Sequence, residues 1–151
     1  MGLLTIRAAT TTDAPAMSVL IEQTIRITNS QDYEPEIVEL ICANFTSEKV
    51  AQKMAERNVF VCFQNEALAG TISLGGDKLH SLFVKPCLQR RGIGTQLVEY
   101  LERHAIQKRI SMLRLSSSIT ARPFYERVGY QFIRFEERKD GSTFLMSKTL
   151  I

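Results

Sequence analysis

The residues whose types and spacing best suggest chemistry lie between Val84 and Gly94, in the stretch VKPCLQRRGIG. Arg90 and Arg91 are followed by Gly92 and Gly94, at the point where a strand-like run gives way to an amphipathic helical pattern. The first amides of a helix have no intrahelical partner, and glycines let a ligand approach them closely. With the helix dipole and two cations beside them, these amides predict an anion site, and we expect a pyrophosphate there.

The spacing excludes two common phosphate loops. A Walker loop needs a lysine before its hydroxyl residue, but Gly94 is followed directly by Thr95. The dinucleotide pattern GxGxxG needs a third glycine where this chain has Leu97. A glycine turn before an ordinary helix remains the structural alternative to an anion site.

Length and composition indicate an ordinary globular protein. The chain has 151 residues, 44% of them hydrophobic and 23% charged, which fits one domain over 1–151. No stretch approaches the roughly 18 apolar residues of a membrane helix. The first residues lack the cationic start and apolar core of a signal peptide. We therefore expect a cytoplasmic protein that does not associate with a membrane.

Charge and cysteine usage exclude two further classes. The net charge is only +3, and the basic residues are scattered, so a nucleic-acid-binding face is not expected. The three cysteines, Cys42, Cys62 and Cys87, are odd in number and far apart in sequence. Neither a disulfide framework nor a metal site of the CxxC kind is indicated, and we expect no metal.

The elements that must position the loop can be read from periodicity. Three strands joined by tight turns predict an antiparallel meander, and a long helix then predicts a parallel crossover to the next strand. We expect an α/β fold of mixed type: a largely antiparallel seven-stranded sheet flanked by about four helices, with strands 4 and 5 parallel. The predicted strands are 3–7, 59–64, 67–75, 78–84, 112–117, 130–138 and 142–150, the last two joined across 139–141. His104 falls on the polar side of the long helix and is expected to face solvent.

Two motifs in this order resemble those of the GNAT N-acetyltransferase superfamily. The first is the strand followed by VKPCLQRRGIG, and the second is SSSITARPFYERVGY, in which a short helix carries Phe-Tyr-Glu and ends at a glycine before an aromatic residue. The predicted order of strands and helices agrees with that fold along nearly the whole chain. The segment IRITNSQDYEPEIVEL is similar to a bacterial subgroup of small members of the superfamily.

The resemblance implies that acetyl-coenzyme A is the co-substrate and lies where strands 4 and 5 splay apart. Backbone groups of the fourth strand would pair with its pantetheine arm, and the amide of Val84 would face the thioester carbonyl. The glycine loop would hold the pyrophosphate. The residues expected to bind the coenzyme are Leu82, Phe83, Val84, Gln89, Arg90, Arg91, Gly92, Ile93, Gly94, Thr95, Ser116 and Phe124, with Thr95 beginning the helix.

The resemblance also implies direct attack of an amine on the thioester in a ternary complex. Tyr125 matches the general acid that protonates the departing thiolate; a packing aromatic is the alternative. His80 is the expected base, because strict alternation would place it on one strand face with Leu82 and Val84. A structural histidine, Asp77, Glu36 or water are the alternatives for the base.

The acceptor would be a primary amine, either a small molecule or the amine of a peptide or protein. The resemblance places Tyr33, Glu34 and Glu36 over its pocket, with Tyr33 and Glu36 expected to contact the substrate, and an acidic, aromatic lining would suit a cationic amine. Relatives are often dimers, so a homodimer is possible. A different class of function is an acyl-coenzyme A sensor that keeps the fold but has little or no turnover.

Overall fold

The computed structural model describes residues 4–139 and 141–151 of the chain. Within them, seven strands form one mixed sheet in the order β1-β2-β3-β4-β5-β7-β6. Each neighbouring pair is antiparallel except β4 and β5, which are parallel. The strands are β1 (Leu4–Ala8), β2 (Asn58–Gln64), β3 (Ala67–Gly75), β4 (Lys78–Val84), β5 (Met112–Ser117), β6 (Gln131–Glu136) and β7 (Thr143–Thr149).

These strands confirm the expected mixed sheet to within two residues at each end. Leu3 and Asp140, which the sequence placed in the first strand and in the last turn, lie outside the described residues. The described part holds five α-helices where about four were expected: α1 (Ala14–Thr24), α2 (Pro35–Cys42), α3 (Ser47–Glu56), α4 (Ile93–Gln107) and α5 (Arg122–Arg127). A π-helical turn, Ile25–Asn29, extends α1.

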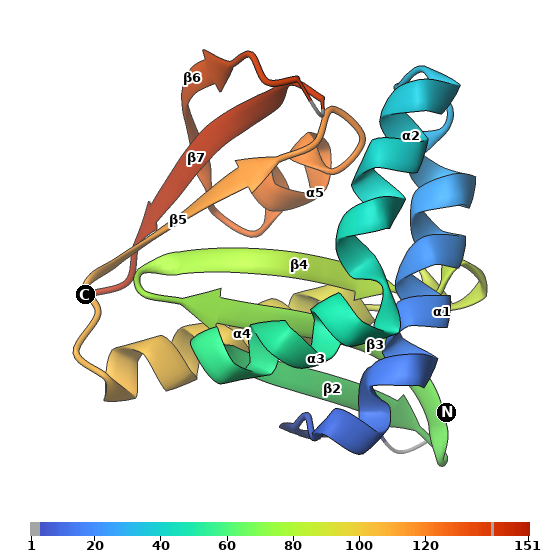
Figure 1. Ribbon diagram of the computed structural model, residues 1–151. Helices are drawn as coiled ribbons and strands as arrows, with labels where there is room; N and C mark the ends of the chain where they lie inside the picture. Colours follow the sequence, from blue (N-terminus) through green and yellow to red (C-terminus); the bar gives the residue numbers. More distant parts are fainter. Residues whose placement is uncertain (1–3, 140) are drawn as a thin grey trace.

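The two faces of the sheet are covered by different helices. Figure 1 shows α1 and α3 over one face of β2, β3 and β4, with α4 on the opposite face. Leu97 and Leu101 of α4 are fully buried against Ile72 and Leu79 of the sheet. The apolar stripe predicted for this helix therefore faces the core, and it anchors the glycine loop that precedes it.

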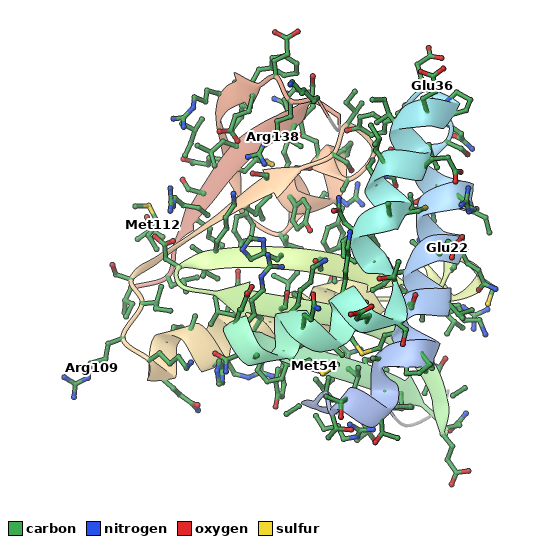
Figure 2. All side chains as sticks on the ribbon, viewed as in Figure 1. Glu22, Glu36, Met54, Arg109, Met112 and Arg138 are labelled. Carbon is green, nitrogen blue, oxygen red and sulfur yellow. The ribbon has the colours of Figure 1, made fainter. Side chains whose placement is uncertain are left out.

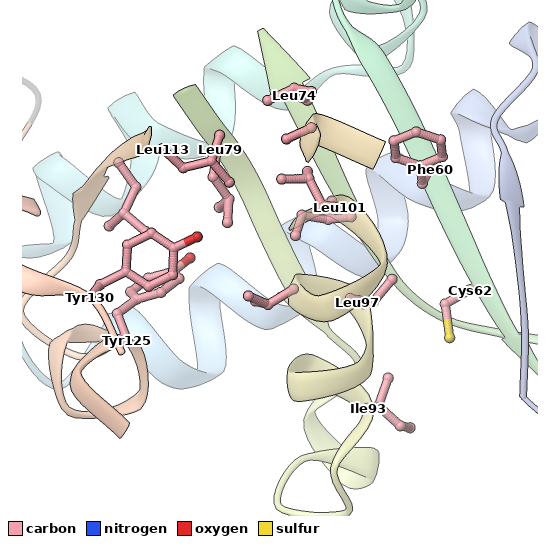
Figure 3. Packing of buried hydrophobic residues seen from close by; sticks show 14 of the residues in the cluster. Phe60, Cys62, Leu74, Leu79, Ile93, Leu97, Leu101, Leu113, Tyr125 and Tyr130 are labelled. Carbon is pink, nitrogen blue, oxygen red and sulfur yellow. The ribbon is translucent and has the colours of Figure 1, made fainter. Parts of the chain in front are cut away.

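A buried polar group ties α4 to the far strands. Glu102 is only 8% exposed, and its carboxylate accepts hydrogen bonds from Tyr130 at 3.0 Å and from Lys148 at 3.1 Å. The ring of Tyr130 lies 5.9 Å from that of Tyr125, and Figure 3 shows the two side by side with their hydroxyls pointing inward. The carboxylate thus supports the packing behind α5.

Replacing Glu102 should destabilise the protein strongly. Glu102→Ala leaves the partly buried Lys148 ammonium without its carboxylate, and we expect the free energy of unfolding to fall by about 2–3 kcal/mol. The same change at Glu99, which is exposed on the same helix, should stay within about 0.5 kcal/mol. Urea unfolding measures both. Equal effects at the two positions would contradict a buried ion pair.

The expectation for His104 was wrong. Its ring packs edge-on against Phe60 with 5.0 Å between centroids, and its Nε2 is buried without a hydrogen-bond partner in the described part of the chain. Burial, followed by the charge of Lys108, lowers the pKa of His104. The covered face of α4 is wider than its aliphatic residues indicated, because Phe60 packs over His104, a position that was expected to face solvent.

Candidate functional site

The glycine loop has the free amides that an anion needs. Gly92 has a φ of 83°, which favours glycine, and α4 begins at Ile93, two residues before the predicted start at Thr95. The first amide near this end with a helical partner is that of Gln96, which donates to the carbonyl of Gly92 at 3.0 Å. Within the described residues, the amides from 91 to 95 donate to no backbone carbonyl. They are available to a ligand.

The charged part of the loop is open to solvent. Arg90, with a φ of 65°, and Arg91 are both exposed, and neither forms an ion pair with any residue that the structure describes. Gln89 turns inward instead, and its side chain donates to the carbonyl of Val84 at 3.1 Å. The loop is therefore fixed to the end of β4 while its two cations remain free to bind an anion.

The second motif meets the loop at Gly94. A Cβ built on Gly94 would lie 3.2 Å from the ring of Phe124 and 3.7 Å from the side chain of Val84. Such a contact is tighter than most packing, so any larger residue here would push the ring of Phe124 back by a few tenths of an ångström. The loop, the end of β4 and the start of α5 thus converge at one point.

Within the described residues, the edge of β4 beyond Leu79 has no strand partner on its β5 side. In that part of the chain only Lys78 and Leu79 pair with β5. Lys85 donates its amide to Ala69 of β3 at 2.8 Å, so strand alternation turns the amide of Val84 away from β3, toward the unpaired side. This is the splay that the sequence predicted, and it leaves a strand edge to which an extended ligand can add.

A β-bulge changes the position of His80. Thr71 and Ser73 of β3 are opposite Phe83 and His80, so β4 holds one residue more than β3 over this span, and Ser81 has a φ of 54°. The prediction that His80 shares a face with Leu82 and Val84 was therefore wrong. The extra residue reverses the alternation and places His80 on the face of Phe83, toward α1 and α3.

His80 now lies in a cavity among cations. Burial, followed by the charges of Arg57, Lys78 and Lys53, lowers its pKa to about 4. Its imidazole is neutral at pH 7, so it can accept a proton, although a base with so low a pKa gives little driving force. The role of His80 as the base stays a prediction, now on the other face of the strand.

The shifted pKa gives a pH dependence of stability. The unfolded chain binds a proton at His80 near pH 6.5 and the folded one only near pH 4, so stability is lost as the pH falls through this window. His80→Gln, which cannot take up the proton, should lose less stability between pH 6.5 and 4 than the wild type does. Denaturant unfolding across that range measures the difference. Parallel curves would contradict a depressed pKa at His80.

The side chain of Tyr125 is buried in α5, next to Phe124, whose ring lies beside Gly94 of the glycine loop. Its ring packs against Phe124, with 5.3 Å between centroids, and against Tyr130. Burial raises the pKa of the phenol above its ordinary value, so the hydroxyl is protonated throughout the neutral range. It donates to no protein group in the described residues, and can therefore donate to a ligand.

A cavity of about 430 Å³ lies beside the unpaired edge of β4. His80, Ser81 and Phe83 form its wall on the strand. Opposite them, Tyr33 bridges separate segments: its hydroxyl donates to the carbonyl of Ser142 and accepts from the amide of Ile119, each at 3.0 Å. The other lining residues are Asn29, Ile41, Asn44, Phe45, Lys53, Arg57, Ser118, Arg138, Gly141 and Thr143.

The acidic lining expected beside Tyr33 belongs to a neighbouring cavity of about 530 Å³, whose lining includes Asp32 and Glu34, and not to this one. Tyr33 lines it, but Glu36 does not, and Figure 2 shows Glu36 at the outer end of α2, pointing away from the sheet. The charged residues of the lining are Lys53, Arg57 and Arg138 instead. Residues of α3 and of the segment after β6 thus line the site, which nothing in their spacing along the chain indicated.

Two other predicted residues lie outside the cavity. The Ser116 hydroxyl donates to Glu136 at 3.4 Å, on the face of β5 opposite the buried Leu115. Asp77, an alternative for the base, pairs with Arg114 at 3.0 Å in the β3–β4 turn. A coenzyme contact at Ser116 stays a prediction, carried by its backbone rather than by its engaged side chain.

In residues 4–139 and 141–151, no helix has the length and apolar character to cross a membrane. Over the same part of the chain, no three histidine, cysteine, aspartate or glutamate side chains gather as metal ligands do.

Comparison with known proteins agrees with this geometry. The model of the acetyltransferase (GNAT) domain family matches residues 29–150. YafP of Escherichia coli (strain K12), an uncharacterized N-acetyltransferase, is 30% identical over 134 residues, which are 89% of this chain and 85% of YafP.

Two solved structures share the fold. The GCN5-related N-acetyltransferase of Rhodopseudomonas palustris superposes with a TM-score of 0.92, at 22% identity, over 99% of this chain and 97% of its own. The PaiA N-acetyltransferase of Thermoplasma acidophilum, solved with coenzyme A, gives 0.83 at 22% identity, over 97% and 99%. Because the family model covers most of the chain and includes both motifs, this protein belongs to the GNAT acetyltransferase family.

Proposed function

We propose that this protein transfers an acetyl group from acetyl-coenzyme A to a primary amine, by direct attack in a ternary complex. The observation that carries the proposal is the convergence at Gly94. There the loop with free amides, the unpaired end of β4 at Val84 and the Phe124–Tyr125 motif come together. Membership of an acetyltransferase family supports acetyl-coenzyme A as the donor.

Each part of the site has a role in this proposal. The pantetheine arm pairs with the free edge at Leu82, Phe83 and Val84, and the pyrophosphate lies on the loop amides beside Arg90 and Arg91. The amide of Val84 faces the thioester carbonyl and stabilises the negative charge that develops on its oxygen.

The chemical step needs two proton transfers. The amine nitrogen forms a bond to the carbonyl carbon and loses a proton to a base, for which His80 and water are the candidates. The carbon–sulfur bond then breaks, and the Tyr125 hydroxyl gives its proton to the departing thiolate. No bond between the acetyl group and the protein is formed.

Initial-rate kinetics test this proposal. Free-thiol release is measured while acetyl-coenzyme A and each of a panel of amines are varied together. A ternary complex predicts intersecting double-reciprocal lines, whereas a covalent acetyl-enzyme predicts parallel ones. Tight coenzyme binding without acceptor-dependent release would favour the alternative function, an acyl-coenzyme A sensor.

Three further points stay proposals. We propose that the catalytic domain is single and extends over 1–151, since β1 and α1, which precede the part matched by the family model, pack into the same sheet and core. The acceptor is a small-molecule amine or the amine of a peptide. Pairing of two chains into a homodimer rests on the resemblance alone.

A further inference from the structure

The cavity beside β4 has an excess of positive charge. Its lining includes Lys53, Arg57 and Arg138, and none of its lining residues within 4–139 and 141–151 is acidic. Arg138 is compensated from outside the cavity by Glu136, 3.3 Å away. Lys53 and Arg57 form no ion pair in the described part of the chain. Neither cation therefore has an ion-paired counter-ion among the described residues, although burial, which lowers the pKa of Arg57, is opposed in part by the charge of the neighbouring Glu56, which raises it.

The ammonium of Lys53 is held in place by neutral groups. It donates to the carbonyl of Asn44 at 2.8 Å and lies 3.7 Å from the centre of the Phe45 ring. Burial, followed by the charges of Arg57 and Lys49, lowers the pKa of Lys53 to about 8. Burial also lowers the pKa of Arg57. Both cations are thus poorly solvated, and a bound anion would stabilise them.

Arg57 lies against the strand whose edge would hold the acyl donor. A Cβ built on Gly75 would be 3.2 Å from Cγ of Arg57 and 3.3 Å from Nε2 of His80. The glycine therefore makes room for both side chains at once, and the stem of Arg57 passes beside the imidazole. On the opposite wall of the cavity, the buried hydroxyl of Thr143 has no hydrogen-bond partner among the described residues.

We propose that the acceptor is a small primary amine that also carries an anionic group, a carboxylate or a phosphate. The anionic group binds Arg57 and Lys53, which places the amine toward the edge of β4. This inference rests on the proposed acetyl transfer and names its substrate class. A guanidinium binds either anion through two parallel hydrogen bonds. The volume of about 430 Å³ is that of a small-molecule site.

The same charges disfavour polycationic acceptors. A polyamine or an aminoglycoside would bring further positive charge toward Lys53 and Arg57, in a partly buried site where repulsion is weakly screened. Such amines therefore serve in the experiment as the contrasting class.

The test compares amines in matched pairs that differ only in the anion. Thiol release from acetyl-coenzyme A is measured with glycine against glycinamide, β-alanine against its amide, phosphoethanolamine against ethanolamine, and glucosamine 6-phosphate against glucosamine. Spermidine represents the polycations. We expect kcat/KM for at least one anionic member to exceed that of its partner by about 10–100-fold, the worth of one hydrogen-bonded charge. The amino-acid and phosphate pairs distinguish the two anions.

A variant assigns the effect to the cavity. Arg57→Gln should remove most of the preference within the best pair while leaving KM for acetyl-coenzyme A unchanged, and Arg57→Lys should restore part of it. Arg109→Gln is the matched control, because Arg109 lies beyond the far end of α4 and points away from the molecule in Figure 2. A rise in the coenzyme KM of Arg57→Gln, with the pair preference kept, would overturn the inference.

A binding measurement keeps this inference separate from the transferase proposal. Calorimetric titration of each pair into the coenzyme A complex needs no turnover. Charge-dependent binding without thiol release for any amine would support the inference and contradict acetyl transfer. Equal binding within every pair, or turnover of neutral and polycationic amines only, would overturn the inference and leave any observed transferase activity standing.

Discussion

Tyr125→Phe is expected to lower kcat by about 10²–10⁴-fold, the usual contribution of a general acid. The hydroxyl is the only atom lost, so the buried ring still packs between Phe124 and Tyr130. Without it, the thiolate leaves unprotonated or takes its proton from water. The dissociation constant of coenzyme A should stay nearly unchanged, because the loop and the strand edge are untouched.

Rates of thiol release and calorimetry of coenzyme A binding measure the two quantities. Tyr100→Phe is the matched control. Tyr100 lies on α4, where its ring packs against Phe60 of β2, away from α5, so this variant should keep wild-type turnover. Wild-type turnover in Tyr125→Phe would show that the residue is a packing aromatic and would leave the acid unassigned.

Gly94→Val is expected to weaken coenzyme A binding by about 100-fold or more. The new side chain would start 3.2 Å from the ring of Phe124 and would cover the amides that the pyrophosphate needs. Losing two hydrogen bonds to a charged group, each worth about 1.5 kcal/mol, accounts for an effect of this size. Calorimetric titration of coenzyme A into both proteins is the measurement.

A pair of variants separates the two causes of that loss. Gly94→Ala alone crowds both Phe124 and the amides, whereas Gly94→Ala with Phe124→Leu relieves only the crowding of the ring. If covered amides are the cause, affinity stays low in the double variant. Full recovery there would place the effect on Phe124, and unchanged affinity in Gly94→Val would refute the loop as the pyrophosphate site.

Features that depend on local pattern could be predicted from the sequence. The alternation of strands, the apolar stripe of α4 and the turn residues fix the order of elements, and the loop before α4 follows from its glycines and arginines. The closeness of Phe124 to Gly94, by contrast, is seen only in the structure. The expected order of elements held because each helix, strand and turn is determined mainly by residues that are close together in the sequence.

Features that depend on tertiary contacts could not be predicted. The bulge at Ser81 has no glycine or proline to mark it, so strict alternation placed His80 on the wrong face. A cation near the end of a helix is explained by its attraction to the helix dipole, so nothing in the sequence singles out Arg57. Only the packing of α3 on the sheet brings it beside His80, and only that packing makes the cavity cationic.

The central claim is most directly tested by following the acetyl group itself. The protein is incubated with acetyl-coenzyme A labelled in the acetyl carbons and with the amine that gives the fastest thiol release, and the products are read by mass spectrometry. Direct transfer predicts labelled N-acetyl amine in an amount equal to the thiol released, with no label on the protein after rapid quenching. Thiol release without acetylated amine, or label held on the protein before it reaches the amine, would contradict it.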